Sequence, residues 1–112
     1  MKRIALLIGI IMLGFSGVSS AGSVTNATIT NVAIFQGIGD LLFINVNQAV
    51  NSQPSCSNNT GFQFVISLAT TLGQQTMAVI LAARTAGAPV TISGTGTCSV
   101  YSNVETLTNI TY

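Results

Sequence analysis

The sequence predicts a small domain that is mainly β with one helix, an α+β fold. Three observations indicate this. Short stretches in which apolar and polar residues alternate are separated by segments rich in Gly, Pro, Ser and Asn, as in strands joined by turns. Residues 71–86 are instead apolar at helical spacing, and Gly87 and Pro89 follow them. Two cysteines, Cys56 and Cys98, bracket that helical stretch.

The N-terminus has the features of a secretory signal peptide. A positively charged start is followed by an uncharged apolar run over residues 4–15 and by small residues that end at Ala21. The run is too short for a comfortable membrane span. We therefore expect a signal peptide over 1–21, cleaved after Ala21, and one secreted or periplasmic domain over 22–112 with no integral membrane segment. The alternative is an uncleaved anchor.

Beyond Ala21 the chain is almost uncharged. Asp40, Arg84 and Glu105 are its only charged side chains, which leaves one net negative charge. A single arginine cannot neutralise a run of phosphates, so a nucleic-acid partner is excluded, and a polybasic membrane patch fails for the same reason. The polar surface must consist of Asn, Gln, Ser and Thr, which suit sugars or protein backbones. Low charge also favours self-association.

The two cysteines of an exported chain predict one disulfide, Cys56–Cys98. The loop-entropy model gives about 4 kcal/mol of stabilisation for a loop of this length. The alternatives are two free thiols or a metal pair. Since the chain has no histidine and no other cysteine, a metal site lacks ligands, and we expect neither a metal nor a cofactor.

The first two strands are expected to form a hairpin. In residues 24–36 the apolar positions change parity, which implies a bulge near Thr30 or Asn31. A strand bent in this way can serve two sides of a small barrel. After a glycine-containing turn, residues 41–47 alternate and pair with the first strand. The inward residues of this second strand are Leu42, Ile44 and Val46.

A polar loop over 48–61 leads to a third strand and then to the helix. The strand covers residues 61–68, and its core side chains are Phe62, Phe64, Ile66 and Leu68. We expect Thr71 to cap the helix, with Gln74 at the capping-box position. The helix is apolar on both sides, which predicts burial on more than one face, either at a barrel end or in an oligomer. Gly87 ends it.

Two strands follow the helix. Residues 89–94 form a short strand with Val90 and Ile92 inward, and the last strand covers 104–112. The order is therefore strand, strand, strand, helix, strand, strand. That is the order of an OB-like five-stranded antiparallel barrel, in which the helix lies between the third and fourth strands.

The passage from the helix into the next strand contains a distinctive set of residues: Ala82, Ala83, Ala86, Gly87, Pro89, Val90, Ile92, Gly94 and Cys98. In these residues the chain resembles small exported bacterial proteins with one disulfide, and the B subunits of subtilase-cytotoxin-like A-B toxins. The resemblance implies an OB-like barrel, assembly into ring pentamers and binding of glycans. It covers about the C-terminal half of the mature chain, and no glycan-contact motif maps onto individual residues.

The residue types that most catalytic mechanisms need are missing. The chain has no histidine, so Ser–His and Cys–His nucleophiles are excluded. Asp40 and Glu105 are the only carboxylates, and nothing in the sequence brings them together as a glycosidase pair requires. The glycine turns lack the lysine and the helix of a phosphate loop. We expect no enzymatic activity.

A few residues qualify as ligand contacts. Arg84 could hold a carboxylated sugar through its guanidinium group, or it could be a cation at the helix C-terminus that pairs with Glu105. Tyr101 lies beside Ser102 and Asn103 at a bend, where a ring and two polar side chains could meet a ligand. The alternative for Tyr101 is a half-buried strand residue.

Our first hypothesis is a secreted, non-catalytic binding module that forms a homo-oligomer, such as a ring, and binds a glycan or a partner protein. Tyr112 is a second candidate for stacking on a ligand. The second hypothesis is a structural or surface-assembly protein, such as a fibre or matrix subunit, that adds strands edge to edge. An inhibitor of a secreted enzyme is a third hypothesis.

Overall fold

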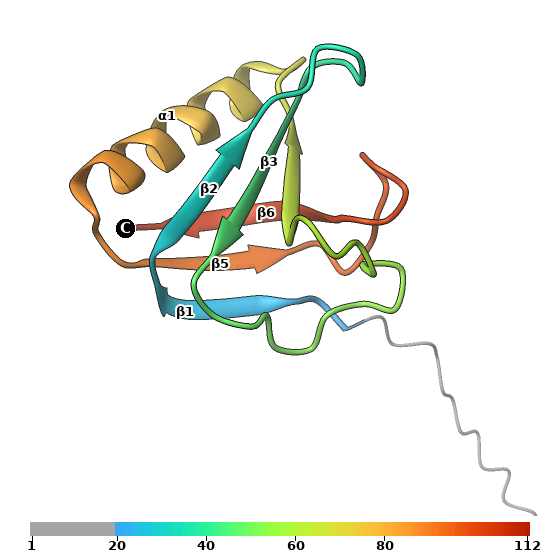
Figure 1. The fold of residues 1–112 in the computed structure, drawn as a ribbon, viewed down its shortest axis with the longest axis horizontal. Coiled ribbons are helices and arrows are strands. Elements are labelled where there is room, and N and C mark those ends of the chain that lie inside the picture. Colours follow the sequence, from blue (N-terminus) through green and yellow to red (C-terminus); the bar gives the residue numbers. More distant parts are fainter. Residues whose placement is uncertain (1–19) are drawn as a thin grey trace, which may run out of the picture.

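The computed structural model describes residues 20–112, so the apolar run over 4–15 lies outside the described residues. The described chain is mainly β with one helix, as the sequence predicts, and six strands form one mixed sheet in the order β1-β5-β6-β4-β3-β2. In Figure 1 the helix lies across one side of the sheet. The elements are β1 Ser23–Ala27, β2 Ile29–Ala33, β3 Leu41–Val46, β4 Phe64–Ser67, α1 Thr71–Ala86, β5 Val90–Gly94 and β6 Glu105–Thr111.

The expected first strand is two strands in the structure. Thr28 alone separates β1 from β2, and β1 pairs antiparallel with β5 while β2 pairs antiparallel with β3. A register shift between Ile29 and Asn31 confirms the bulge predicted near Thr30. One segment of chain therefore supplies both end strands of the sheet, and the sheet has six strands where five were predicted.

The fully antiparallel arrangement that we predicted is wrong at one pair. β4 and β6 run parallel, with Phe64 opposite Glu105 and Val65 opposite Thr106. α1 and β5 lie between these two strands in the sequence. Such a crossover connection is what allows the chain to return in the same direction. The pairs β3–β4 and β5–β6 are antiparallel, as expected.

The main core lies between the sheet and α1. It contains the predicted inward residues of β3 and β5 together with apolar side chains from every other element: Val24, Ala27, Ile29, Leu42, Ile44, Val46, Phe64, Ile66, Ile80, Ala83, Val90, Ile92 and Leu107. These residues are nearly all apolar and buried, so burial of apolar surface on this side holds the helix on the sheet.

An aromatic cluster forms on the opposite face of β3 and β4. Phe43 and Val65 point to this face because successive side chains of a strand alternate. The rings of Phe35, Phe62 and Tyr101 each lie within 5.7 Å of the Phe43 or Phe62 ring, centre to centre. We predicted that Phe62 shares a face with Phe64, which is wrong, because β4 begins only at Phe64 and Phe62 precedes it.

The cap of α1 differs from the prediction by one residue. Thr70, and not Thr71, is the N-cap, and its Oγ1 accepts a hydrogen bond from the backbone N–H of Gly73 at 2.9 Å. Gln74 donates from Nε2 to the carbonyl oxygen of Leu68 at 3.0 Å, so it does not close a capping box. Gly87 ends the helix with φ 63°, as predicted.

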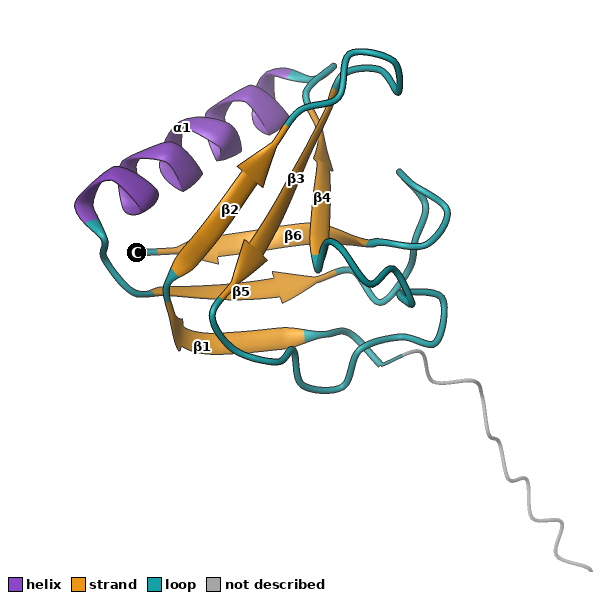
Figure 2. Cartoon of the chain, in the orientation of Figure 1, coloured by secondary structure: helices purple, strands orange, loops and turns teal. Residues whose placement is uncertain are grey.

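Only one face of α1 is buried. Gly73, Ile80 and Ala83 are buried, whereas Leu72, Val79 and Leu81 are exposed, Leu72 by 71%. In Figure 2 the sheet covers one side of the helix and the other side faces away from the strands. The predicted burial on more than one face is therefore not met within one chain. Within residues 20–112, moreover, no helix is both long and apolar enough to cross a membrane.

The predicted disulfide Cys56–Cys98 is present. It joins the loop between β3 and β4 to the loop between β5 and β6. Close to it, the backbone N–H of Asn59 donates to the carbonyl oxygen of Asn103 at 3.1 Å, and Nδ2 of Asn59 donates to Oδ1 of Asn103 at 3.1 Å. The two loops are thus fastened to each other by one covalent bond and two hydrogen bonds.

Candidate functional site

The ligand contacts proposed from the sequence do not form one site. Tyr101, Ser102 and Asn103 follow Cys98 in the loop between β5 and β6, whereas Arg84 lies in the last turn of α1. Figure 1 shows this loop and the C-terminal end of α1 on opposite sides of the molecule. The sequence could not reveal this separation, because it gives no distance between a helix end and a distant loop.

Two of the three loop residues serve the fold. The Tyr101 ring packs edge-on against Phe43, with 5.1 Å between the ring centres, and is half-buried, which was the alternative for this residue. Asn103 accepts the two hydrogen bonds from Asn59 described above. Ser102 alone is exposed to solvent. The bend therefore presents little side-chain surface to a ligand.

Arg84 does not pair with Glu105. Its Nη1 donates to the backbone carbonyl of Ile29 at 3.3 Å, and the residue is exposed in the last turn of α1, where a cation is favourable. Glu105 is fully buried, and its Oε2 accepts hydrogen bonds from the backbone nitrogens of Gly22 and Gly96. The ion pair that was one alternative for Arg84 is therefore not formed, and each of the two residues is hydrogen-bonded to backbone groups instead.

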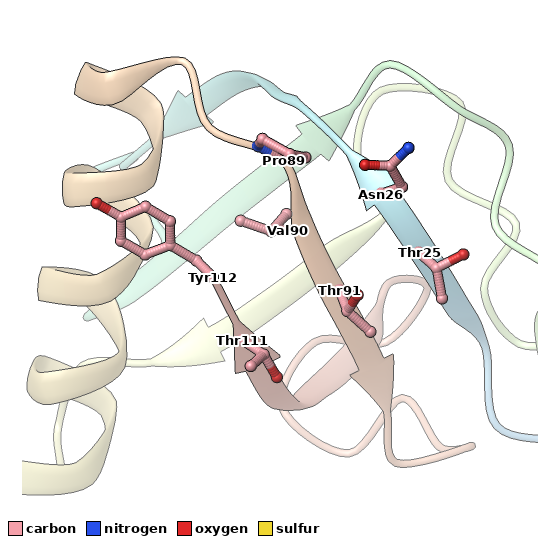
Figure 3. A pocket seen from close by; sticks show the side chains of 7 residues that line it. All are labelled: Thr25, Asn26, Pro89, Val90, Thr91, Thr111 and Tyr112. Atoms are coloured by element: carbon pink, nitrogen blue, oxygen red, sulfur yellow. The ribbon is translucent and has the colours of Figure 1, made fainter.

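A different candidate site lies over β1, β5 and β6. It is an open depression of about 360 Å³ at the ends of these strands, shown in Figure 3. We call it the threonine site, and its lining residues are Thr25, Asn26, Pro89, Val90, Thr91, Thr111 and Tyr112. None of these side chains carries a charge.

Strand register places three threonines of this site in a row. Thr91 pairs with Thr111 across β5 and β6, and the pairing of Val24 with Ile92 brings Thr25 next to Thr91. Because side chains alternate along a strand, the burial of Val24, Val90 and Ile92 in the core means that Thr25 and Thr91 beside them point outward. All three are exposed. The three strands that carry them are spaced about 4.8 Å apart.

Asn26 and Tyr112 lie at the two ends of the row, as Figure 3 shows. Asn26 has φ 53°, a left-handed conformation that asparagine tolerates, and it lies at the register shift of β1 between Val24 and Ala27. Tyr112 follows β6 and is 58% exposed, with its ring on the side of α1. The site therefore combines hydroxyls, a carboxamide and an aromatic face, which provide hydrogen bonds and stacking.

Reasoning from the sequence found Tyr112 but missed the threonines. The signal was present in β5 and β6, where threonine alternates with Val, Ile and Leu. The site also needs Thr25, however, and the pairing of β1 with β5 joins residues far apart in the chain. A local pattern cannot reveal such a pairing.

The residues described by the structure show no cluster of three His, Cys, Asp or Glu that could hold a metal ion. Comparisons of the chain with protein-family models, curated proteins and solved structures gave no match. The resemblance to toxin B subunits therefore stays a prediction, and the function has to be argued from the geometry of the site.

Proposed function

We propose that the protein is a secreted or periplasmic, non-catalytic binding module whose threonine site holds a neutral glycan. The observation that carries this proposal is the uncharged row of three exposed hydroxyls between Asn26 and Tyr112. Sugars are rich in neutral hydroxyls that both donate and accept hydrogen bonds, as threonine and asparagine side chains do. An exposed tyrosine ring can in addition lie against the apolar face of a sugar.

A glycan array tests this proposal with matched variants. Thr91→Val or Tyr112→Ala should weaken binding of the selected glycan by about threefold to tenfold, since each removes one hydrogen bond or one stacking contact. Thr30→Val makes the same change in β2 at an exposed threonine outside the site and should leave binding unchanged. Silence across the array, or equal losses from Thr91→Val and Thr30→Val, would count against the proposal.

We also propose that the sheet is an OB-like barrel. β1 and β2 stand at the two ends of the sheet order, and one residue separates them in the chain. Counting them as one bent strand gives five strands, with the helix between the third and the fourth. This is the predicted order of an OB-like fold.

Self-association through α1 belongs to the same proposal. Leu72 and Val79 expose apolar surface on the helix, and they line a groove that Ile110 of β6 also lines. A second copy of the chain is the partner we propose, because a chain with so few charges repels its own copies weakly. Ring assembly as in toxin B subunits is one form that such an oligomer could take.

Native mass spectrometry of the oxidised, processed protein tests this association. Val79→Lys should shift the protein to the monomer, because a charge at an apolar interface must be desolvated. Thr85→Lys adds the same charge at another exposed position of α1 and should leave the oligomer intact. A wild-type protein that is strictly monomeric at micromolar concentration would contradict the proposal.

Assembly by strand addition is the second candidate function. Within the described chain, β1 and β2 each pair with one strand and are the edges of the sheet. An exposed edge can accept a strand from another copy. Part of the β1 edge is covered, because Ser23 forms a bridge with Asn51 and Nε2 of Gln48 donates to the carbonyl oxygen of Asn26 at 2.9 Å. Filaments in electron micrographs of the processed protein would favour this function over glycan binding.

A further inference from the structure

Glu105 is a fully buried carboxylate with an incomplete set of partners. Its Oε2 accepts hydrogen bonds from the backbone nitrogens of Gly22 at 2.8 Å and Gly96 at 2.9 Å. Its Oε1 is buried and has no hydrogen-bond partner among residues 20–112. Burying a carboxylate is costly unless a positive charge or a complete set of donors accompanies it. The site therefore lacks a donor, and a positively charged donor would suit it best.

No side chain in the described part of the chain supplies this charge. Arg84 is the one basic residue beyond Ala21, and it is exposed and donates to Ile29. The nitrogen of Gly22 is already in contact with the carboxylate. It is therefore the first group to consider as the counter-ion.

Two glycines make room for the Glu105 carboxylate. A Cβ atom on Gly22 would overlap Oε1 of Glu105, and a Cβ atom on Gly94 would overlap Oε2. Neither position has the left-handed φ that demands glycine. The close approach of the carboxylate therefore excludes a side chain at Gly94 and, together with Val50, at Gly22. The side-chain-free face of Gly22 is turned toward the unpartnered Oε1.

Gly22 is also the residue that follows the predicted cleavage site. Hydrolysis of the Ala21–Gly22 peptide bond by a signal peptidase consumes one water, leaves a carboxylate on Ala21 and converts the Gly22 nitrogen into an ammonium group with three N–H donors. Ser20 and Ala21 are exposed, whereas Gly22 is buried. We propose that removal of the signal peptide after Ala21 makes the α-ammonium group of Gly22 the buried counter-ion of Glu105, with donors for both carboxylate oxygens.

This ion pair would fasten the beginning of β1. The carbonyl oxygen of Gly22 already accepts a hydrogen bond from the N–H of Gly94 at 2.8 Å, and Ser23 exchanges two backbone hydrogen bonds with Asn51. Processing would add a charged contact at the same place. The inference depends on the predicted cleavage and not on glycan binding. The proposed ion pair and the proposed glycan binding can therefore fail independently.

The experiment starts from the full chain, exported with its own leader from a bacterial host and purified after processing. Mass spectrometry should give Gly22 as the first residue. The chain beyond Ala21 contains no lysine, so the α-amine is the only primary amine, and an acetylating succinimidyl ester reports on it alone. In the native protein the amine should react at least about tenfold more slowly than in urea, since reaction requires local opening.

Acetylation also removes the charge, which allows a direct test of the ion pair. Protein acetylated in urea with its disulfide intact and then refolded should have an unfolding equilibrium constant at least about tenfold higher than the unmodified protein, because a buried carboxylate loses its counter-ion. The Glu105→Gln variant has nearly the same shape but no charge. In this background acetylation should change the unfolding equilibrium constant little.

A second variant keeps the test decisive if Glu105→Gln does not fold. One alanine inserted between Ala21 and Gly22 should leave a processed chain with one residue before Gly22, an arrangement compatible with the fold because Ala21 precedes Gly22 in the structure. This variant should be destabilised as acetylation destabilises the wild type. Three results for the wild-type protein would overturn the proposal. These are a first residue other than Gly22 after processing, equal labelling of the native and unfolded protein, and equal stability of the free and acetylated forms.

Discussion

The two halves of the sheet present different outer faces. Over β1, β5 and β6 the outer face carries the hydroxyls of the threonine site. Over β3 and β4 it carries Phe43 and Val65, covered by the aromatic rings of Phe35, Phe62 and Tyr101. An antiparallel sheet with one solvated face is polar on that face. The first half follows this rule, and the second half departs from it because it supports a second core under the two loops that the disulfide joins.

The largest effect on stability should come from the half of the sheet formed by β3 and β4, which carries the aromatic cluster. Phe43→Ala removes the ring at the centre of the aromatic cluster, and we expect it to lower the free energy of unfolding by about 3–5 kcal/mol, measured by urea denaturation. Thr25→Ala on the outer face of the other half should change it by less than about 0.5 kcal/mol. Similar losses from both variants would mean that the two faces do not differ as described.

Removing the disulfide should destabilise the half of the sheet formed by β3 and β4 more than the half formed by β1, β5 and β6. Cys56→Ser combined with Cys98→Ser should cost about 2–4 kcal/mol, since the bond closes a loop with a sequence separation of 42 residues. Amide hydrogen exchange should rise first in the two loops beside the aromatic cluster and only later in β1, β5 and β6. An even rise over the whole sheet would show that the disulfide stabilises both halves alike.

A glycine should be sensitive to substitution in the half of the sheet formed by β1, β5 and β6. Gly94→Ala places a Cβ atom against the Glu105 carboxylate, and we expect it to destabilise the protein by about 1–3 kcal/mol. Gly37→Ala is the matched control, because a Cβ atom there meets nothing within 4 Å. It should be neutral or slightly stabilising. Thermal unfolding of the two variants under the same conditions distinguishes these outcomes.

The smallest effect on stability is expected within the threonine site. Thr91→Val should change the free energy of unfolding by less than about 0.5 kcal/mol, because its hydroxyl is exposed and its replacement suits a strand. Urea denaturation beside the glycan measurements would check this. A loss above 1 kcal/mol would indicate that the hydroxyl row serves the fold and not a ligand.

Local patterns predicted much of the fold. The inward residues of β3 and β5, the glycine that ends α1 and the bulge in the first strand were all visible within short stretches, and the disulfide followed from the presence of only two cysteines. The cap was misplaced by one residue because Thr70 and Thr71 have the same side chain, and the choice depends on which hydroxyl reaches the N–H of Gly73. Local sequence does not encode that geometry.

The errors in the site have a common cause, which is contact between distant segments. Pairing of Arg84 with Glu105 was one alternative suggested by the sequence, since a cation is favourable at a helix C-terminus. The real partners of Glu105, the backbone nitrogens of Gly22 and Gly96, carry no side-chain signal at all. The threonine site likewise depends on the pairing of β1 with β5, and the parallel pairing of β4 with β6 could not be read from either strand alone.

The continuity of β1 and β2 has a consequence for how copies of the protein can exchange parts. The segment Ser23–Ala33 is hydrogen-bonded to β5 at one end and to β3 at the other. A copy that donated this segment to a neighbour would have to release both sheet edges at once, with no hinge loop between them to absorb the motion. Domain swapping of the N-terminal segment is therefore opposed by the fold, and copies should associate as complete subunits.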